Sequence, residues 1–400
     1  MSNSIPNSPD SSATQPAVSS IVEAADAIFA STPLAKEFAE SASIPLTPYR
    51  GKHTAKVFSS VPEELASLLT TAGVYDLGWR SFLRCVGDDR VRWLNGMVTN
   101  SVTGLEDNAG CYAFVLNAQG RIQGDLNLYR RADSLWLQTD RAQLETLMAF
   151  LDHYIIMDDV TLEPQDGWTA IGIAGPHAAE KLAATGLSFS GLSAMHLAET
   201  SWRGLSTFVV AAHSPLVPRY EVWVSPDDAV NMWKALLDAG AVPCGVDAVE
   251  QLRILEGTPA YSIDIASRDL PQETNQMRAL HFSKGCYLGQ EIVERIHSRG
   301  NVHRTLSGFV LKGEAPAAKT PILADGQPVG ELTSVASISI PGMASDAAQC
   351  IALGSIRREA LERKAALTVE GNPVTPASLP FDLHGLTSIV QQSSLKESRS

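Results

Sequence analysis

The apolar residues of this chain recur with two different periods. Residues 134–139 alternate between two faces, with Leu135 and Leu137 sharing one of them, and this period of two predicts a β-strand. We expect that strand to pair with residues 121–130, because only a short turn separates the two segments. These two segments are therefore expected to form a β-hairpin.

Three helices are predicted by apolar residues at spacings of three and four. The first begins after Asp140, which is a candidate N-cap. The second opens at Ser225 and Pro226 and ends before Gly240. The third covers residues 246–256 and is closed by a glycine.

Further short apolar runs predict strands at 169–174, 207–212 and 220–224. After Arg304 the runs become shorter and are separated by Gly and Pro, which is typical of a small all-β unit. Strands and helices that are mixed in this way predict an α+β fold followed by a β-domain.

The two ends of the chain have a different composition. Residues 1–20 are rich in Ser and Pro and carry one charge, so we expect a disordered tail, and residues 386–400 also look loosely ordered. Residues 21–56 are expected to form a helical arm and then an extended segment. The N-terminus resembles neither a signal peptide nor a transit peptide, so a cytoplasmic location is expected.

Composition narrows the classes of function. With 400 residues, 44% hydrophobic and 19% charged, the chain is typical of a soluble globular protein, and no apolar run is long enough to predict a membrane span. A formal charge of −13 opposes strong binding to nucleic acids. The five cysteines are scattered and form no C-x-x-C pair, which excludes a disulfide framework, a zinc ribbon and an iron–sulfur cage built from one chain.

One octapeptide contains the most specific chemistry of the sequence. It reads Lys284-Gly285-Cys286-Tyr287-Leu288-Gly289-Gln290-Glu291. The glycines leave the sulfur of Cys286 uncrowded, and both the helix predicted to follow and the ammonium of Lys284 would favour a thiolate. A reactive, accessible thiol is one interpretation, and a small buried residue at a tight turn is the other.

The octapeptide, continued through Arg295 and Gly300, resembles the signature of the YgfZ proteins. These are folate-binding relatives of the glycine cleavage system T-protein, an aminomethyltransferase, and they are linked to the maturation of iron–sulfur enzymes. Weaker motifs match the same family in order between residues 57 and 370. They lie at 74–77, 93–100, 117–126, 173–176, 220–222, 244–253, 329–334 and 351–354.

The resemblance implies a ring of three units around a central hole. Two mixed α/β modules with antiparallel sheets would occupy residues 57–280, and a β-barrel would occupy 304–385. The signature segment and its helix, residues 281–303, would join them. The cofactor implied is tetrahydrofolate or a derivative.

The resemblance also implies functions for two carboxylates. Asp125 matches an aspartate beside the reactive nitrogens of folate, where it could stabilise positive charge. The alternative is an aspartate that caps a turn. Glu221 matches the glutamate that holds the pterin, whose two adjacent N–H donors suit a carboxylate. The alternative is a cross-strand ion pair with little effect on stability.

Four further residues belong to the expected folate site. Tyr112 and Tyr220 would stack on the pterin, or serve only as core aromatics. Asn100 is included through its family motif. Arg253 would face the glutamate tail of folate, or else a helix-surface acid.

Residues near the signature suggest further binding. His281, His297 and His303 flank Cys286, but their spacing fits no known metal cage, so no metal site is predicted. Local basic residues such as Arg295 could dock an acidic partner or RNA, or form a solvated helix face.

The leading hypothesis is a tetrahydrofolate-binding factor that supports iron–sulfur cluster assembly or repair, with Cys286 as its functional thiol. Its partners would be folate and iron–sulfur client or assembly proteins, including tRNA-modifying enzymes. The rival hypothesis is a folate-dependent aminomethyltransferase or methyltransferase that uses Asp125, although T-proteins differ where this chain has Cys286. A third is a binding scaffold without folate.

Overall fold

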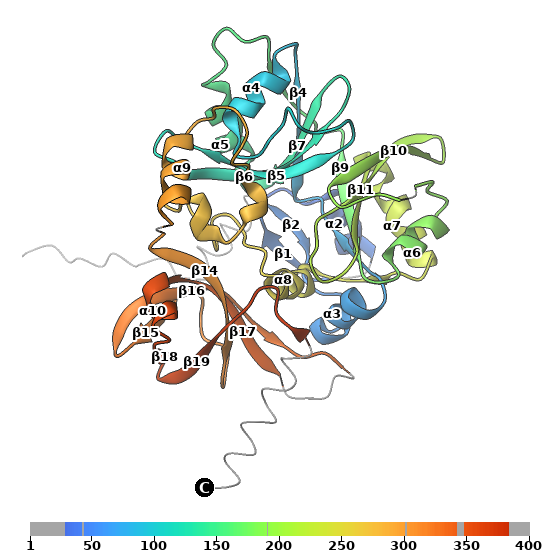
Figure 1. Cartoon of the computed structure of the whole chain (residues 1–400). Coiled ribbons are helices and arrows are strands. Elements are labelled where there is room, and N and C mark those ends of the chain that lie inside the picture. The colour runs from blue at the N-terminus through green and yellow to red at the C-terminus, as the bar shows by residue number, and fades with distance from the viewer. Residues whose placement is uncertain (1–28, 42–43, 190, 301, 342–347, 384–400) are drawn as a thin grey trace, which may run out of the picture.

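Two α/β modules and a β-barrel form the molecule (Figure 1). The structure, a computed structural model, describes residues 29–41, 44–189, 191–300, 302–341 and 348–383. The expected tails at 1–20 and 386–400 lie outside the described residues. Within the described part, no helix is both long enough and apolar enough to cross a membrane.

The N-terminal arm contains helix α2 (Pro33–Ser41) and a two-stranded hairpin of β1 (Leu46–Tyr49) and β2 (Lys52–Ala55). The sequence predicted an extended segment here but not its pairing. Arg50 and Gly51 form the turn with φ of 48° and 97°, the left-handed conformations that suit a two-residue hairpin loop. This turn places Arg50 beside the first module.

The first module is a five-stranded antiparallel sheet in the order β5-β6-β7-β4-β8. Its elements are β4 (Arg80–Val86), α4 (Arg90–Met97), β5 (Gly110–Leu116), β6 (Ile122–Arg130), β7 (Leu135–Asp140), α5 (Arg141–Asp152) and β8 (Thr161–Pro164). The predicted hairpin is confirmed as β6 and β7, with Asn127 opposite Gln138. Helix α5 begins after Asp140 as predicted, but the Asp140 side chain makes no capping hydrogen bond.

The second module is a six-stranded sheet in the order β10-β11-β12-β9-β3-β13, in which only the β13–β3 pair is parallel. Its strands are β3 (Gly73–Asp76), β9 (Thr169–Ala174), β10 (His196–Trp202), β11 (Leu205–Ala211), β12 (Arg219–Val224) and β13 (Val242–Pro243). Because β3 precedes β4 in the chain, the first module is inserted between β3 and β9. The three strands predicted from 169 to 224 are confirmed.

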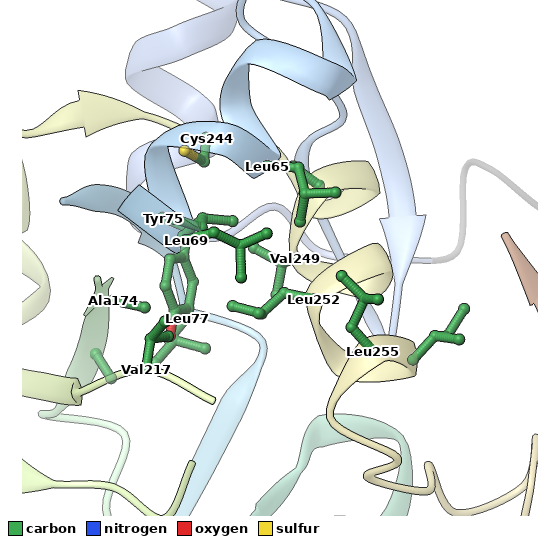
Figure 2. Close-up of a cluster of buried hydrophobic side chains, with 14 of the residues drawn as sticks. Leu65, Leu69, Tyr75, Leu77, Ala174, Val217, Cys244, Val249, Leu252 and Leu255 are labelled. Atoms are coloured by element: carbon green, nitrogen blue, oxygen red, sulfur yellow. The ribbon is translucent and has the colours of Figure 1, made fainter. Parts of the chain in front are cut away.

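Four helices accompany this sheet: α3 (Val61–Thr70), α6 (Ala178–Ala184), α7 (Ala229–Asp238) and α8 (Val246–Leu255). The second predicted helix opens with a short 3-10 turn, η1 (Pro226–Asp228), where the Ser225 hydroxyl accepts a hydrogen bond from the Asp228 amide at 3.2 Å. Figure 2 shows α3 and α8 beside β3, with Leu69 of α3 next to Tyr75 and with Leu65 and Leu252 in the same buried cluster. Burial of this apolar cluster fixes α8 beside the sheet.

The two sheets face each other through aromatic side chains. Trp136 of β7 lies 6.0 Å from Trp223 of β12, and Phe82 of β4 lies 4.6 Å from Trp223, measured between ring centroids. Side chains alternate along β12, so Val222 and Val224 pack with the helices on the other face. Glu221 and Trp223 therefore point toward the first module.

Residues after 303 form a closed barrel in the order β14-β17-β16-β15-β18-β19, which confirms the predicted all-β unit. Its elements are β14 (Arg304–Leu311), β15 (Pro321–Ala324), β16 (Gln327–Ile338), β17 (Gln349–Arg357), α10 (Arg358–Glu362), β18 (Leu367–Val369) and β19 (Asn372–Ala377). The 3-10 turns η2 (Pro271–Thr274) and η3 (Met277–Ala279) and the helix α9 (Gln290–Arg299) lie between the second module and the barrel in the chain.

Candidate functional site

A cavity lies where the two sheets meet, and described residues between 49 and 278 line it. The arm hairpin, β5, β6, β12, α8 and the loop 258–261 all contribute side chains. No residue of the barrel lines it among the described residues, so the cavity belongs to the two α/β modules. Of the predicted folate-site residues, Tyr112, Asp125, Glu221 and Arg253 are brought together here.

Asp125 projects from β6 into the cavity and accepts two side-chain hydrogen bonds. The Tyr112 hydroxyl donates to Oδ2 at 2.6 Å, and the Gln143 amide donates to Oδ1 at 2.8 Å. Burial, and next the negative charge of Asp140, raise the pKa of Asp125 above its ordinary value. The carboxyl group therefore keeps its proton to a higher pH than a surface aspartate does.

Glu221 projects from β12 of the facing sheet and is buried, with 6% of its surface exposed. Its Oε2 accepts hydrogen bonds from the Gln138 amide at 2.5 Å and from the Trp223 indole at 2.8 Å. No Lys or Arg lies within 4 Å of it among the described residues, so the alternative of a cross-strand ion pair is wrong. Its second oxygen, Oε1, accepts no hydrogen bond from the described residues, and the residue lines the cavity.

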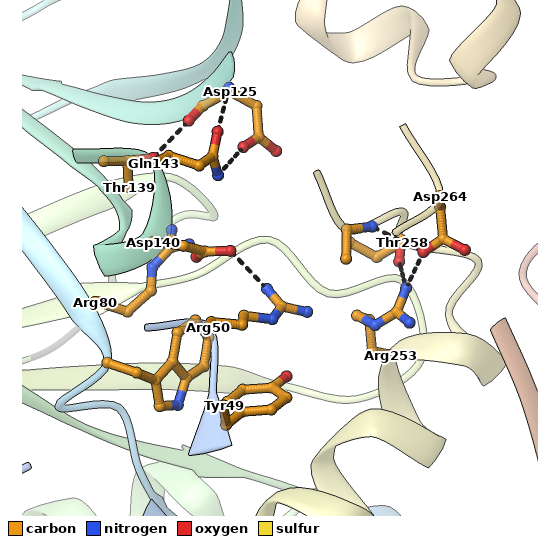
Figure 3. Close-up of polar contacts among 12 residues, drawn as sticks. Tyr49, Arg50, Arg80, Asp125, Thr139, Asp140, Gln143, Arg253, Thr258 and Asp264 are labelled. Atoms are coloured by element: carbon orange, nitrogen blue, oxygen red, sulfur yellow. Dashed lines mark hydrogen bonds and ion pairs between the residues drawn. The ribbon is translucent and has the colours of Figure 1, made fainter. Parts of the chain in front are cut away.

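A network of ion pairs forms one wall of the cavity (Figure 3). Asp140 pairs with Arg50 at 3.2 Å and with Arg80 at 2.5 Å. Arg80 also donates to Gln138 at 3.1 Å, which in turn holds Glu221. This explains why Asp140 does not cap α5: its carboxylate is taken by two arginines.

Arg253 is buried in α8, and its expected contact with a folate tail is not supported. Its five N–H groups donate to Glu250, to Asp264, to the Thr258 carbonyl and to the Ser334 hydroxyl. Figure 3 shows the contacts to Thr258 and Asp264. A guanidinium has five donors in all, so no donor remains for a ligand. Arg253 instead ties α8 to Ser334 of the barrel. The other hypothesis, an acid on the helix surface, is met by Glu250, which lies one turn earlier on α8 with 25% of its side chain exposed, whereas the second acid partner, Asp264, is buried.

Two other predicted folate contacts lie outside the cavity. Tyr220 precedes Glu221 on β12, so it faces the opposite side of the sheet, where it packs against Phe189 at 5.6 Å. The amide nitrogen of Asn100 donates to the carbonyls of Tyr112 and Arg278, each at 2.9 Å, and its amide oxygen accepts from the Ser101 N–H. Both are therefore corrected to structural residues, and Asn100 positions two residues that do line the cavity.

The signature segment packs on the first module. Lys284 donates to the carbonyls of Asn95, Val98 and Asn100 at 2.6 to 2.7 Å, at the C-terminal end of α4. Its ammonium is thus directed into the module and does not pair with the thiol of Cys286, contrary to the sequence-based expectation. The carbonyl end of a helix is the favourable place for such a cation.

Cys286 is an exposed free thiol in the loop before α9 and does not line the cavity. The alternative of a buried residue at a tight turn is therefore wrong. Helix α9 begins at Gln290, and Gly289 before it adopts φ of 81°. A Cβ on Gly289 would lie 2.6 Å from the Asn117 carbonyl, so this glycine lets the segment contact the 117–120 turn.

The histidines near the signature form no metal centre in the described residues, which contain no group of three metal-ligating side chains. His297 stacks on Phe282 with ring centroids 3.8 Å apart. Cys286 is thus a single thiol at an open surface.

Sequence patterns did not indicate four residues that shape the cavity: His213, Arg278, Gln138 and Gln143. His213 lines the cavity, and burial together with the charges of Arg278 and Arg219 lowers its pKa to about 4. None of these residues belongs to a motif, and no local signal could have assigned them, since strands far apart in the chain bring them together.

Comparisons with known proteins agree with this geometry. The model of the GCVT N-terminal domain matches residues 28–284, and the model of the CAF17 C-terminal beta-barrel domain matches residues 304–380. The chain is 26% identical to the aminomethyltransferase of Rubrobacter xylanophilus over 72% of this chain and 78% of the relative. It is 25% identical to the aminomethyltransferase of Streptomyces avermitilis over 72% and 81%.

Among solved structures, the glycine cleavage system aminomethyltransferase T from Bartonella henselae has the same fold. It superposes with a TM-score of 0.78 at 20% identity and covers 88% of this chain and 98% of that one. This confirms the predicted architecture of two α/β modules and a C-terminal barrel. The chain belongs to the family defined by the GCVT N-terminal domain, and it carries a C-terminal barrel of the CAF17 type.

Proposed function

We propose that this protein binds tetrahydrofolate or a derivative in the cavity and supports iron–sulfur cluster assembly or repair in client enzymes of the cytoplasm, with Cys286 as its functional thiol. The clients would include tRNA-modifying enzymes. Folate binding is the part with the most direct structural support, and the role in cluster assembly rests on the signature segment.

The observation that carries the proposal is a pair of carboxylates in one cavity, Asp125 and Glu221, which have no cation within 4 Å among the described residues. A buried carboxylate that lacks a counterion must be stabilised by hydrogen bonds or neutralised by a proton. A pterin ring supplies adjacent N–H donors that match the two oxygens of one carboxylate. Glu221 is suited to accept one of these donors, because Oε1 accepts no hydrogen bond from the described residues while Oε2 already accepts two. Asp125 would lie beside the reacting nitrogens.

Calorimetry under anaerobic conditions tests folate binding. We expect wild type to bind tetrahydrofolate and Glu221→Gln to bind it roughly ten- to a hundredfold more weakly, because one charged acceptor is lost. Glu199→Gln is a matched control, since Glu199 forms an exposed ion pair with Arg131 away from the cavity. Folded wild type that binds neither tetrahydrofolate nor a related folate would contradict the proposal.

The thiol is tested by complementation of a strain that lacks this gene. We expect Cys286→Ala to leave iron–sulfur enzymes poorly active, because a thiolate is the group that holds iron or attacks sulfur. Ser283→Ala is the control, since Ser283 is also small, exposed and in the same segment. Full recovery of iron–sulfur enzyme activity with Cys286→Ala would remove the thiol from the proposed function.

A second candidate function, folate-dependent aminomethyl or methyl transfer, is favoured by Asp125. Its raised pKa and its place in the cavity suit a group that orients a nucleophile or stabilises charge in the transition state. Incubation with a methylated amine donor and tetrahydrofolate should then yield methylene-tetrahydrofolate. A reaction that Asp125→Asn abolishes would place this function first.

A further inference from the structure

The arginines that line the cavity are not equivalent. Four of them, Arg50, Arg80, Arg219 and Arg253, pair with buried or half-buried carboxylates. Arg278 is the fifth, and no carboxylate lies within 4 Å of its guanidinium among the described residues. A largely buried cation without a counterion is costly, so its retention in a cavity needs an explanation.

The backbone and side chain of Arg278 are both held in place. Its carbonyl accepts a hydrogen bond from Asn100 at 2.9 Å. Its Nε donates to the Gln276 side chain at 3.1 Å, and its guanidinium lies 4.3 Å from the ring centroid of Tyr112. The two terminal nitrogens make no hydrogen bond among the described residues, so four N–H groups are available on a preorganised planar cation.

The surroundings of Arg278 also favour an anion from outside the protein. His213 lines the same cavity and is neutral at physiological pH, because burial and two arginines lower its pKa to about 4. It neither neutralises Arg278 nor competes for an anion. Burial lowers the pKa of Arg278 itself, which shows that the nearby acids do not compensate its desolvation.

We infer that Arg278 is the carboxylate-binding group of this cavity, and that the ligand places a carboxylate on its terminal nitrogens. The inference rests on the proposed folate site, which it deepens. A planar monoanion with two oxygens matches one unpaired guanidinium, whereas a phosphate dianion would require further free cations. Tyr112 connects Arg278 to Asp125, because its ring lies against the guanidinium of Arg278 and its hydroxyl donates a hydrogen bond to Asp125.

The carboxylate has two chemical sources, the glutamyl end of folate itself or a small amino acid bound next to the folate. Calorimetry separates them with three ligands: tetrahydrofolate, a tetrahydropterin that lacks the aminobenzoyl-glutamate, and glycine titrated into the tetrahydrofolate-bound protein. The proteins are wild type, Arg278→Gln, Arg278→Lys and Arg203→Gln. Arg203 is a matched control, since it also stacks on an aromatic ring, Trp202 at 4.4 Å, but is exposed.

If folate supplies the carboxylate, Arg278→Gln should bind tetrahydrofolate roughly ten- to a hundredfold more weakly and bind the tetrahydropterin like wild type. If an amino acid supplies it, glycine binding should fall by a similar factor while tetrahydrofolate binding is unchanged. In either case Arg278→Lys should be intermediate, because it keeps the charge and loses the planar fork, and Arg203→Gln should match wild type.

Equal binding of tetrahydrofolate and glycine by wild type and Arg278→Gln would overturn the inference, as would a wild type that binds no carboxylate ligand. The tetrahydropterin keeps the two proposals apart. If wild type binds the tetrahydropterin, but its binding of tetrahydrofolate and of glycine does not depend on Arg278, the folate site is retained and the carboxylate subsite is rejected. Glycine binding that depends on Arg278, without any pterin binding, would do the reverse.

Discussion

Tyr112 and Asp125 lie diagonally across neighbouring strands of the first sheet, and the tyrosine hydroxyl donates to the aspartate Oδ2 at 2.6 Å. Diagonal residues on one face of an antiparallel pair are close enough for such a contact. The hydrogen bond fixes the carboxylate at the cavity wall, and the ring of the same tyrosine makes a cation–π contact with the guanidinium of Arg278. One aromatic side chain therefore positions an acid and a cation together.

Asp125→Asn should stabilise the protein at neutral pH. Because its pKa is raised in the folded state, the native protein binds more protons than the unfolded chain between the ordinary and the raised pKa, so stability falls as pH rises through that window. Removing the charge should raise the free energy of unfolding at pH 7 by on the order of 1 kcal/mol. The gain should vanish as pH falls below about 3.9, the usual aspartate pKa.

Urea denaturation of both proteins as a function of pH measures this gain. Asp133→Asn is the control, since a hydrogen bond from Ser134 and the charge of Arg84 lower the pKa of that aspartate. The control should show no gain at pH 7. A wild type more stable than Asp125→Asn at pH 7 would mean that the Asp125 carboxylate is compensated in the folded protein.

Lys284→Met should loosen the signature segment. The substitution removes three hydrogen bonds from an ammonium to the carbonyls at the end of α4, at an expected loss of about 2–3 kcal/mol in unfolding free energy. Amide hydrogen exchange should become faster in residues 281–289. If exchange and stability matched wild type, Lys284 would not anchor the segment, and its presence in the signature would need a different reason.

The two glycines of the signature should respond differently to alanine. A Cβ at Gly289 would meet the Asn117 carbonyl at 2.6 Å in a left-handed conformation, whereas a Cβ at Gly285 would meet nothing within 4 Å. Gly289→Ala should lower the free energy of unfolding by about 2 kcal/mol, and Gly285→Ala should change it by less than about 0.5 kcal/mol. Thermal denaturation of the two variants measures this difference. Similar losses of stability in both would mean that the left-handed conformation and close contact of Gly289 do not limit substitution there.

His213 should remain neutral until pH falls to about 4. Since its folded pKa is lowered, the native protein binds fewer protons than the unfolded chain between about 6.5 and 4, and stability should be lost as pH falls through that range. The shift of its imidazole resonances with pH measures the pKa directly. In Arg278→Gln the value should rise, because one of the charges that lower it is gone; an unchanged value would place Arg278 too far from His213 to act.

Periodicity predicted individual elements well and their surroundings less well. The alternation at 134–139 gave the correct strand β7, yet both faces of that strand are buried. Leu137 packs with α5 and the core of the first module, while Trp136 and Gln138 meet the second sheet. A period of two assigns residues to faces, but whether water or another sheet covers a face depends on distant segments.

The site residues differ in the same way. Asp125 and Glu221 were named from family motifs and line one cavity together with Tyr112. Tyr220 shares the motif of Glu221, and Asn100 lies in the motif at 93–100, but neither of them lines the cavity. Adjacent residues on a strand point in opposite directions, so a motif on β12 can contribute only one of its neighbours to the cavity. Arg278 and His213 lie in no motif: Arg278 belongs to the 3-10 turn η3, and His213 lies between β11 and β12.

The sequence by itself determined several of the strands and helices, the all-β unit at the C-terminus and the signature around Cys286, because local propensity, turn residues and spacing are properties of short segments. Only the tertiary structure decided that Cys286 is exposed, that Lys284 is directed inward and that Arg253 has no donor left. It also left Arg278 without a carboxylate among the described residues. The free groups of a cavity depend on which charges meet across the fold, and that pairing joins residues far apart in the chain.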